Sequence, residues 1–299
     1  MKKFVIISDS CCDLSKELRE KYDVDYIPMR MIFEGRDLPA DLDWQDVSMP
    51  EFYESMRKGN RITTAQITTA MYCERFEKYL AEGYDVLSLS CSSALSNSVK
   101  ESFKARDQLL AKYPDRKIIC IDTLNACISL GILCIRASEM RAEGKTIEET
   151  AAWIEANRLF VNQECTVDKL TYLKQAGRVS ATSAFFGGLL SVKPIIISDV
   201  RGLNTAVEKV TGRKTSIRRL VERFKEEYES APYQRVFVEH ADSLADAQEL
   251  KALIEEALPD KDVPVELCYI GPIVGATTGP GTLAVCFFGK EVTYDHLAK

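Results

Sequence analysis

The chain has 299 residues, a formal net charge of −6 and 46% hydrophobic residues, which is the composition of a globular protein with a sizeable core. The acidic balance gives no support to nucleic acid or an anionic membrane as the main partner. No apolar run reaches the roughly 18 residues that a membrane span needs. The apolar run at residues 4–7 ends at Ser8, too early for a signal peptide, so we expect a cytoplasmic protein.

Ten cysteines are spread through the chain, and none forms a C-x-x-C pair. Several lie in apolar segments, so the sequence predicts buried free thiols in a reducing cytosol. His240 and His296 are the only histidines, and we therefore expect no zinc site and no other bound metal.

Strands and helices alternate in the first half of the chain. Strands are predicted at 4–7, 24–29, 86–89 and 117–122, helices after Asp13, at 51–58, from 68 or 69 to 81, from Ser98 to 113 and at 124–143, and a surface connection at 34–49. Thr146 and Glu149 have the spacing of a capping box for one more helix. This alternation predicts a parallel-sheet α/β domain over residues 1–160, with ligands beyond the carboxyl ends of the strands.

The pattern changes over residues 161–299, which we predict to be an α+β domain with a partly antiparallel sheet. Strands are predicted at 192–197 and 203–210 as a hairpin, at 235–239 and at 265–270, with a closing hairpin of 283–288 and 292–294. Helices are predicted at 169–175, 215–228 and 242–258, and a further segment begins at Ser180 and contains F-F-G-G-L-L.

A turn rich in hydroxyl groups follows the apolar run at 86–89 and includes Ser92, Ser93 and Ser96. Ser98 and Glu101 have the spacing of a capping box, so the next helix is predicted to begin there. Hydroxyls and free N–H groups at the positive end of a helix suit an anion, and a carboxylate fits better than a triphosphate because no glycine-rich phosphate loop is present. The alternative is that these serines only cap the helix.

A second hydroxyl cluster, I-T-T-A-Q-I-T-T at 62–69, precedes the helix that ends near residue 81. Capping by Thr68 or Thr69 needs one threonine and leaves Thr63 and Thr64 unexplained. Two such clusters favour a binding site for an acidic group more than one does.

An ordered set of motifs resembles the DegV family, which includes the fatty-acid-binding subunits of bacterial fatty acid kinase. The motifs are S-D-S at 8–10, T-T-A-Q at 63–66, S-S-A-L-S-N-S at 92–98, D-T at 122–123, L-K-Q-A-G-R-V-S at 173–180, L-L-S-V-K-P-I at 189–195 and I-G-P-I-V-G-A-T-T-G-P-G-T at 270–282. The resemblance implies a DegV-like two-domain fold that holds one long-chain fatty acid, such as palmitate, between its domains, with no other cofactor.

The resemblance also implies roles for single residues. The carboxylate would be held by Thr64 with Thr63, by Ser93 with Ser92, and by the last glycine-rich motif, where Thr277 stands in place of the family's histidine and Thr278 follows it. Secondary candidates are Ser96, Gly275, Ala276 and Arg178. A threonine offers only a neutral donor, so this replacement is expected to weaken head-group binding by about 1–2 kcal/mol.

The resemblance implies a non-catalytic carrier, which could present its ligand to a cytoplasmic fatty acid kinase. Arg178 is either a surface residue or part of a kinase-docking face with Arg213 and Lys214. Two other functions stay open: binding of another amphipathic or phosphorylated small molecule, and a serine esterase or acyltransferase assisted by His240. The hydrolase lacks a G-x-S-x-G elbow around Ser92 and Ser93.

Overall fold

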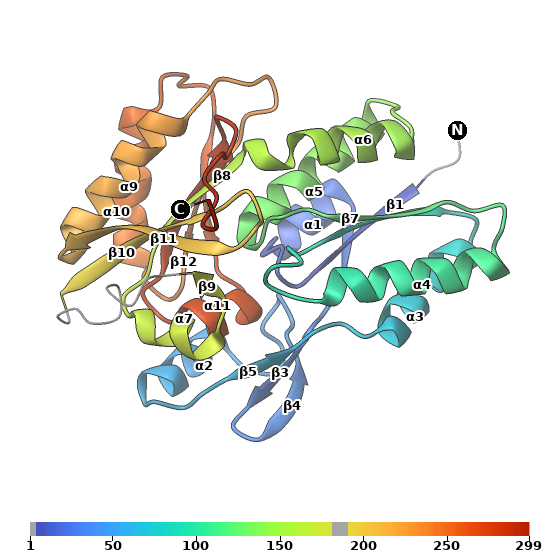
Figure 1. The fold of residues 1–299 in the computed structure, drawn as a ribbon, viewed down its shortest axis with the longest axis horizontal. Coiled ribbons are helices and arrows are strands. Elements are labelled where there is room, and N and C mark those ends of the chain that lie inside the picture. The colour runs from blue at the N-terminus through green and yellow to red at the C-terminus, as the bar shows by residue number, and fades with distance from the viewer. Residues whose placement is uncertain (1–3, 181–190, 299) are drawn as a thin grey trace.

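The computed structural model describes residues 4–180 and 191–298 (Figure 1). Most of the segment predicted to follow Ser180, with its F-F-G-G-L-L motif, lies outside the described residues. The helices are α1 (Lys16–Tyr22), α2 (Met49–Arg57), α3 (Thr69–Ala81), α4 (Ser98–Lys112), α5 (Cys127–Ala142), α6 (Ile147–Asn157), α7 (Leu170–Ala176), α9 (Arg213–Glu227), α10 (Leu244–Ala257) and α11 (Pro272–Thr278), with a 3-10 turn at Arg158–Phe160.

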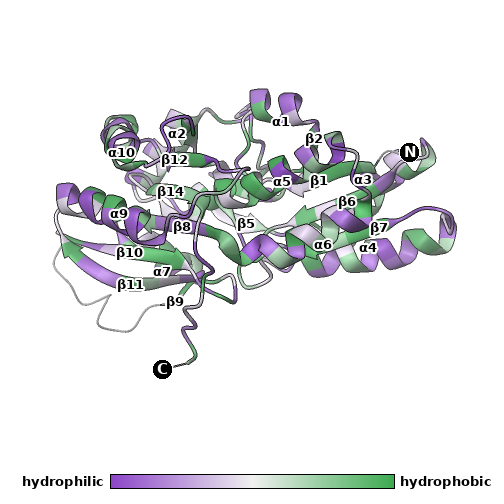
Figure 2. Cartoon of the chain, turned by 90° about the horizontal axis from the view of Figure 1, so that it is seen from above, coloured by the Kyte–Doolittle hydropathy of each residue, from purple (hydrophilic) through white to green (hydrophobic). Residues whose placement is uncertain are grey.

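The first sheet is parallel and has the order β2-β1-β6-β7, formed by Val24–Ile27, Phe4–Asp9, Asp85–Ser90 and Ile118–Asp122. Its central strands are buried on both faces, because α3 and α4 pack on one side and α5 and α6 on the other (Figure 1). In Figure 2, β1 and β6 are coloured largely as hydrophobic. Continuous apolar strands of this kind are typical of parallel sheets, and the predicted α/β architecture is confirmed.

The second sheet is larger and mixed, with the order β13-β12-β14-β8-β10-β11-β9. Its strands are Val265–Tyr269, Val236–His240, Leu283–Phe288, Val161–Thr166, Val192–Ser198, Asn204–Thr211 and Val179–Ser180. The pairs β10–β11, β8–β10, β8–β14 and β12–β14 are antiparallel, whereas β12–β13 and β9–β11 are parallel, so the predicted partly antiparallel sheet is confirmed. Helices α9 and α10 cover one face, α9 through Leu220 and Phe224 and α10 through Leu250.

A third sheet, β4-β3-β5, was not predicted. It consists of Arg36–Pro39, Arg30–Phe33 and Thr63–Ala65, all antiparallel. The expected surface connection at 34–49 is therefore wrong over its first residues, and the strand expected at 24–29 ends at Ile27 before the chain enters this sheet. The pairing of β3 with β5 joins segments about thirty residues apart, which no local pattern reports.

Two helices begin with the predicted caps, and two others do not. Thr68 caps α3 and Thr146 forms the expected capping box with Glu149. Asp13 does not cap α1; Ser15 accepts the Leu18 N–H instead, and Asp13 is buried. The helix α4 does begin at Ser98, but the expected capping box is absent.

Both members of that predicted box have tertiary partners. The Ser98 Oγ accepts the N–H of Ile67 at 3.1 Å, and Glu101 accepts a hydrogen bond from Thr69. Long-range partners have replaced the local pair.

The closing hairpin is also wrong in its second arm, because β14 ends at Phe288 and residues 292–294 form no strand. Val292 donates its N–H to the Leu159 carbonyl at 2.8 Å, and Val200 donates to the Tyr294 carbonyl at 3.0 Å. These two backbone hydrogen bonds, the Arg201–Asp295 ion pair at 2.9 Å and a bond from His296 to Asp199 together hold the C-terminal segment.

Helix α5 lies between the two large sheets and contacts β1 and β6 on one side and β8 and β14 on the other. Twelve of its residues are buried, as expected for a helix that is apolar on all sides. Gly131 permits close approach, since a Cβ there would lie 2.6 Å from the Cys12 carbonyl oxygen. The strands of the first sheet end at Asp122 and those of the second begin at Val161; a domain division at residue 160 stays a prediction.

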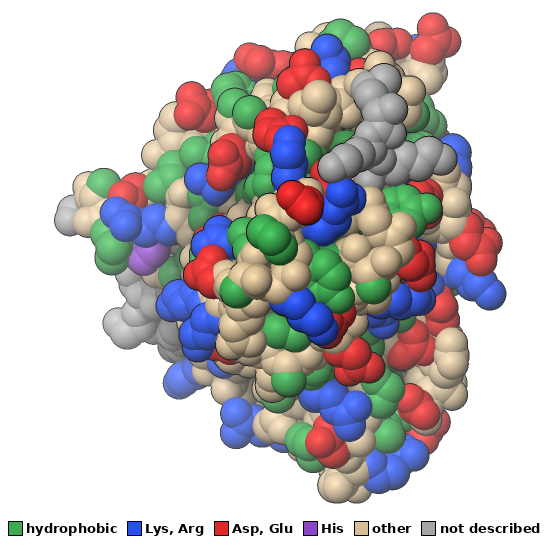
Figure 3. All heavy atoms as spheres, turned by 90° about the vertical axis from the view of Figure 1, so that its right-hand side faces the viewer, with side chains coloured by type: hydrophobic (Ala, Val, Ile, Leu, Met, Phe, Trp, Pro, Cys, Tyr) green, Lys and Arg blue, Asp and Glu red, His purple; other side chains and the backbone are tan. Residues whose placement is uncertain are grey.

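The surface carries both signs of charge. On the face shown in Figure 3, Lys and Arg side chains alternate with Asp and Glu, and no large patch of one sign forms. Among the described residues, no helix is both long enough and apolar enough to cross a membrane.

Candidate functional site

Two aspartates, the buried Asp9 and the partly buried Asp122, hold together the turns at the carboxyl ends of β1, β6 and β7. Asp9, at the end of β1, accepts the N–H groups of Cys11 at 2.9 Å and Cys91 at 2.8 Å. Asp122, at the end of β7, accepts the N–H groups of Ser93 and Leu124, each at 3.1 Å. Because parallel strands end at one edge of a sheet, these contacts fix three turns beside each other, as predicted.

Burial dominates the ionisation of Asp9. The surrounding core raises its pKa to about 6, although the two N–H groups that it accepts act in the opposite direction. The side chain therefore serves as a hydrogen-bonding bracket for the adjacent β1 and β6 turns.

The serine-rich turn uses most of its N–H groups internally. The Ser92 Oγ accepts the Ala94 N–H at 3.2 Å, and the Ser92 carbonyl accepts the N–H groups of Leu95 and Ser96, each at 3.0 Å. Ser96 and Ser98 share a hydrogen bond of 2.9 Å between their hydroxyls. The expected free N–H groups at this helix start are thus largely occupied, and the Ser93 hydroxyl is left without a hydrogen bond to any described residue.

The second hydroxyl motif reaches the same place through a strand. Thr64 lies in β5 and pairs with Met31 of β3. Thr63 and Thr64 therefore belong to a strand, whereas the sequence predicted them at a helix start. β-branched threonines suit such a strand. The link from Ile67 to Ser98 then fastens this segment to the serine-rich turn.

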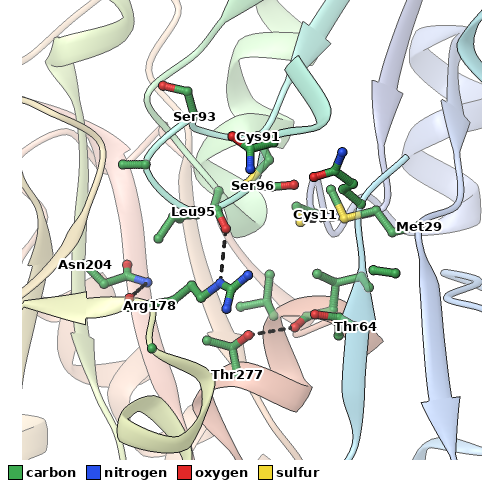
Figure 4. Close-up of a pocket in the computed structure, with 18 of the residues that line it drawn as sticks. Cys11, Met29, Thr64, Cys91, Ser93, Leu95, Ser96, Arg178, Asn204 and Thr277 are labelled. Atoms are coloured by element: carbon green, nitrogen blue, oxygen red, sulfur yellow. Dashed lines mark hydrogen bonds between the residues drawn. The ribbon is translucent and has the colours of Figure 1, made fainter. Parts of the chain in front are cut away.

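These segments surround one pocket of about 510 Å³ (Figure 4). Helix α11, which carries Thr277, closes one side, and the Gly177–Arg178 turn closes another. Its lining residues are Cys11, Met29, Thr64, Ala65, Gln66, Cys91, Ser93, Ala94, Leu95, Ser96, Asn97, Ala126, Gly177, Arg178, Asn204, Ile273, Val274, Thr277 and Thr278. Polar groups and apolar side chains share the wall, which is the composition of a small-molecule site.

The structure places six of the predicted site residues in this pocket: Thr64, Ser93, Ser96, Arg178, Thr277 and Thr278. In the view of Figure 4 the Ser93 hydroxyl points away from Thr64, so contact of both with one carboxylate requires rotation about the Ser93 Cα–Cβ bond. Thr277 donates to the Ile273 carbonyl at 3.2 Å within its own helix.

The other predicted residues lie nearby but outside the main pocket. Thr63 and Ala276 line a neighbouring, smaller pocket. Ser92 is fully buried behind the turn. Gly275 makes room for Tyr53, whose hydroxyl oxygen would lie 2.4 Å from a Cβ at this position.

Arg178 lies at the rim, where it lines both of these pockets. Its Nε donates to the Leu95 carbonyl at 3.3 Å and its Nη1 to the Ala176 carbonyl at 2.6 Å. It forms no ion pair with a carboxylate of the described residues. The guanidinium is therefore held over the serine-rich turn with its charge uncompensated.

Sequence reasoning missed several wall residues. Met29 follows β2, Asn204 begins β11, and Cys11 and Cys91 lie on the two adjacent turns. Cys11 also donates to the Met29 sulfur at 3.9 Å. Cys11 and Cys91 lie together on the pocket wall because β1 and β6 are neighbours in the first sheet. A correct prediction of that strand order would have placed them there.

All ten cysteines belong to the described part of the chain, and all are free thiols. Nine are buried, whereas Cys73 is partly exposed. Cys127 and Cys286 lie 3.9 Å apart and form, with Glu239, a compact buried group of donor atoms within 4.8 Å of one another. Burial raises the pKa of both thiols. The sequence-based expectation of no metal site considered histidines, and it did not include this cluster of two thiols and a carboxyl group.

Neither histidine lines the pocket. The Nδ1 of His240 accepts the Ser243 N–H at 3.2 Å, which is a structural role. His296 bonds to Asp199 near the C-terminus. The Ser93 hydroxyl thus lacks a histidine base among the described residues.

The fold and the pocket define a class of protein: two sheets that share a central helix, with a ligand pocket where the carboxyl ends of parallel strands meet helix α11. The sequence matches a family model described as "Uncharacterised protein, DegV family" over residues 3–290. The chain belongs to the DegV family, and the resemblance seen in its motifs is confirmed.

Relatives match nearly the whole chain. A DegV domain-containing protein of Clostridium perfringens is 37% identical over 289 residues, covering 97% of this chain and 98% of its own length. A crystal structure of a DegV lipid-binding protein from Thermotoga maritima has 28% identity and a TM-score of 0.83, covering 97% of this chain and all of its own. A stearic-acid-binding protein from Eubacterium ventriosum has 25% identity and a TM-score of 0.84, covering 96% and 98%.

Proposed function

We propose that this protein binds one long-chain fatty acid, with its carboxylate among Thr64, Ser93 and Thr277. The observation that carries the proposal is that these three hydroxyl residues, which come from three separate segments of the chain, line one pocket with apolar neighbours. Structural relatives described as lipid-binding and stearic-acid-binding support the same ligand class. Each buried CH₂ contributes about 0.8 kcal/mol, so the acyl tail supplies most of the affinity.

The head group needs positive charge, and Arg178 is the source that the pocket offers. Thr277 supplies a neutral hydroxyl only, whereas a guanidinium can make charge-assisted hydrogen bonds to a carboxylate. Its position at the rim, bonded to the serine-rich turn, supports this role. The same rim is where a phosphorylated head group would emerge.

We further propose a non-catalytic carrier that operates in the cytoplasm and presents its ligand to a fatty acid kinase. Ten free thiols favour a reducing compartment. The esterase alternative gains no support, because neither histidine lines the pocket that holds Ser93 and each bonds to a residue elsewhere.

Protein purified from cells is expected to carry a stoichiometric acyl compound, because an apolar tail in a pocket of this size exchanges slowly with water. Organic extraction followed by mass spectrometry measures the bound lipid. Protein unfolded and refolded in lipid-free buffer is the control, and it should yield no acyl compound. An empty extract from the native protein, together with no binding of added palmitate, would sink the fatty-acid proposal.

Ser93→Ala is expected to weaken binding of a fluorescent fatty acid about fivefold to tenfold, the effect of losing one hydrogen bond to a charged group. Ser88→Ala is the matched control, since Ser88 is a buried serine of β6 that does not line the pocket. Titration monitored by fluorescence compares the two. Equal affinities of the two variants would remove Ser93 from the head-group site.

A further inference from the structure

Two thiols and one carboxyl group meet in the core, where the first turn of α5 packs on the large sheet. They belong to Cys127, the first residue of α5, Glu239 of β12 and Cys286 of β14. One donor atom from each lies within 4.8 Å of the other two, and all three residues are buried. Glu239 and Cys286 do not line the main pocket, so the proposed fatty-acid site leaves this group unexplained.

Strand register brings the two sheet residues together. Glu239 pairs with Ala284 across the antiparallel strands β12 and β14. Cys286 lies two positions after Ala284, so its side chain projects from the same face of the sheet as that of Glu239. Cys127 approaches this face from α5, whose next residue, Ile128, donates its N–H to the Glu239 Oε1 at 3.3 Å. Three separate segments therefore supply one donor group each.

The spacing of the two sulfurs matches a tetrahedral zinc site. Zn–S bonds of about 2.3 Å at a tetrahedral angle place two sulfurs about 3.8 Å apart. The Sγ atoms of Cys127 and Cys286 lie 3.9 Å apart. Thiolates and carboxylates are both ligands that zinc takes, whereas Mg²⁺ and Ca²⁺ prefer oxygen alone.

A cavity of about 30 Å³ adjoins the group and is lined in part by Cys127, Gln163 and Glu239. A space of this size holds no more than one water. It therefore suits a single ion, or the water that completes the coordination of one, and no organic ligand. The Gln163 Oε1 accepts the Cys127 thiol at 3.2 Å, so it becomes available as a further oxygen ligand once that proton is lost.

The first turn of α5 suits a group with negative charge. A zinc ion with two thiolates and one carboxylate carries a net charge of −1, and the N-terminus of a helix is the positive end of its dipole. Ala126, at the cap of α5, offers no side-chain hydrogen bond to this turn. Cys127 has a φ of +49°, which is uncommon for a residue other than glycine and is typical of residues constrained at binding sites.

Asp13 supports Glu239 from the other side. The two buried carboxyl groups are hydrogen-bonded to each other, which requires that the pair holds a proton. Apart from Asp13, the Glu239 Oε2 has no hydrogen-bond donor in the described parts of the chain. A proton that stays on Asp13 can be donated to one oxygen of Glu239 while the other oxygen binds an ion, and such contacts orient metal ligands.

We propose that Cys127, Glu239 and Cys286 bind one Zn²⁺ ion, which fastens α5 to strands β12 and β14 of the large sheet. Without the ion, burial raises the pKa of both thiols and of Glu239, so the three groups are neutral. Zinc would replace their three protons, which leave to solvent. The proposal does not depend on the identity of the lipid.

The test uses the full chain, unfolded in urea with a thiol reductant and refolded either with Zn²⁺ or with a chelator. After gel filtration, wild type refolded with Zn²⁺ is expected to contain one zinc per chain by plasma mass spectrometry. Its midpoint of urea unfolding is expected to exceed that of the chelator-treated protein, because an ion that binds only the folded state stabilises it. Co²⁺ in place of Zn²⁺ is expected to give a thiolate-to-metal absorption band in the near ultraviolet.

Cys286→Ala is expected to retain about a tenth of the zinc or less and to lose the shift in midpoint. Cys134→Ala is the matched control, since it removes another buried thiol of α5 that lies outside the group, and it should keep both. Should the first variant not fold, Cys286→Ser takes its place, because it nearly preserves the side-chain volume without providing a thiolate.

The proposal is overturned if wild type refolded with Zn²⁺ contains no more zinc than Cys286→Ala, or if that variant keeps both the zinc and the shift in midpoint. A different metal in stoichiometric amount in protein purified from cells would overturn the assignment of zinc. Absence of a bound lipid in a protein that holds zinc would instead contradict the proposed function alone.

Discussion

Replacing Gly202 by alanine is expected to lower the free energy of unfolding by about 3 kcal/mol, from a strained left-handed backbone and a steric clash together. Gly202 has φ of +73° in the turn between β10 and β11. A Cβ there would lie 2.2 Å from the Ser92 Oγ and 2.8 Å from the Leu124 Cα. Denaturation by urea, monitored by circular dichroism, measures the loss.

Gly35→Ala is the matched control for this change. Gly35 has φ of +80°, but no atom lies within 4 Å of the position of its Cβ. Only the backbone term remains, about 1 kcal/mol. Because Gly202 presses on the serine-rich turn from the second half of the molecule, its variant is also expected to weaken fatty-acid binding. Equal destabilisation by the two alanines would show that the contact with Ser92 is not tight.

Asp13→Asn is expected to become more stable than wild type as the pH rises. Burial raises the pKa of Asp13 in the folded protein above its ordinary value of 3.8, to about 7. A group that binds its proton more tightly when folded stabilises the fold at low pH, and this stabilisation is lost as the pH rises from about 4 to about 7. Asparagine does not titrate, and it tolerates the φ of +48° at this position.

The difference in the free energy of unfolding between Asp13→Asn and wild type should therefore grow by roughly 2–4 kcal/mol between pH 4 and pH 8. Urea denaturation at a series of pH values measures it. Asp295→Asn is the control: Arg201 lowers the pKa of this partly buried carboxyl to about 2, so its difference from wild type should stay constant between pH 5 and pH 8. A constant difference for Asp13→Asn as well would contradict the assigned burial effect.

The sequence-based predictions succeeded where a single segment contains its own information. The apolar strands β1, β6 and β7 and the capping box at Thr146 depend on local pattern, and the structure confirms them. The strand Thr63–Ala65 was not predicted, because its partner β3 lies about thirty residues away in the chain. The capping box predicted at Ser98 and Glu101 was wrong, because the two side chains accept hydrogen bonds from Ile67 and Thr69 instead.

The site residues show the same contrast between local and long-range information. Motifs predicted that Thr64 and Ser93 would share a site, and both line the main pocket. Local pattern could not place Arg178 over the serine-rich turn, because its hydrogen bond to Leu95 spans 83 positions. Nor could it show that Glu239 lies beside Ala284 on the large sheet, since this depends on the register of β12 and β14.

The position of helix α5 has a consequence for how the protein can be divided. By sequence it belongs to the first half, yet its buried surface is completed by strands β8 and β14 of the second. A fragment that stops near residue 160 would present this apolar helix to water, which favours aggregation over independent folding. Splitting, permuting or inserting into the chain at that boundary would therefore damage both halves together, although a linker search by composition would choose the same place.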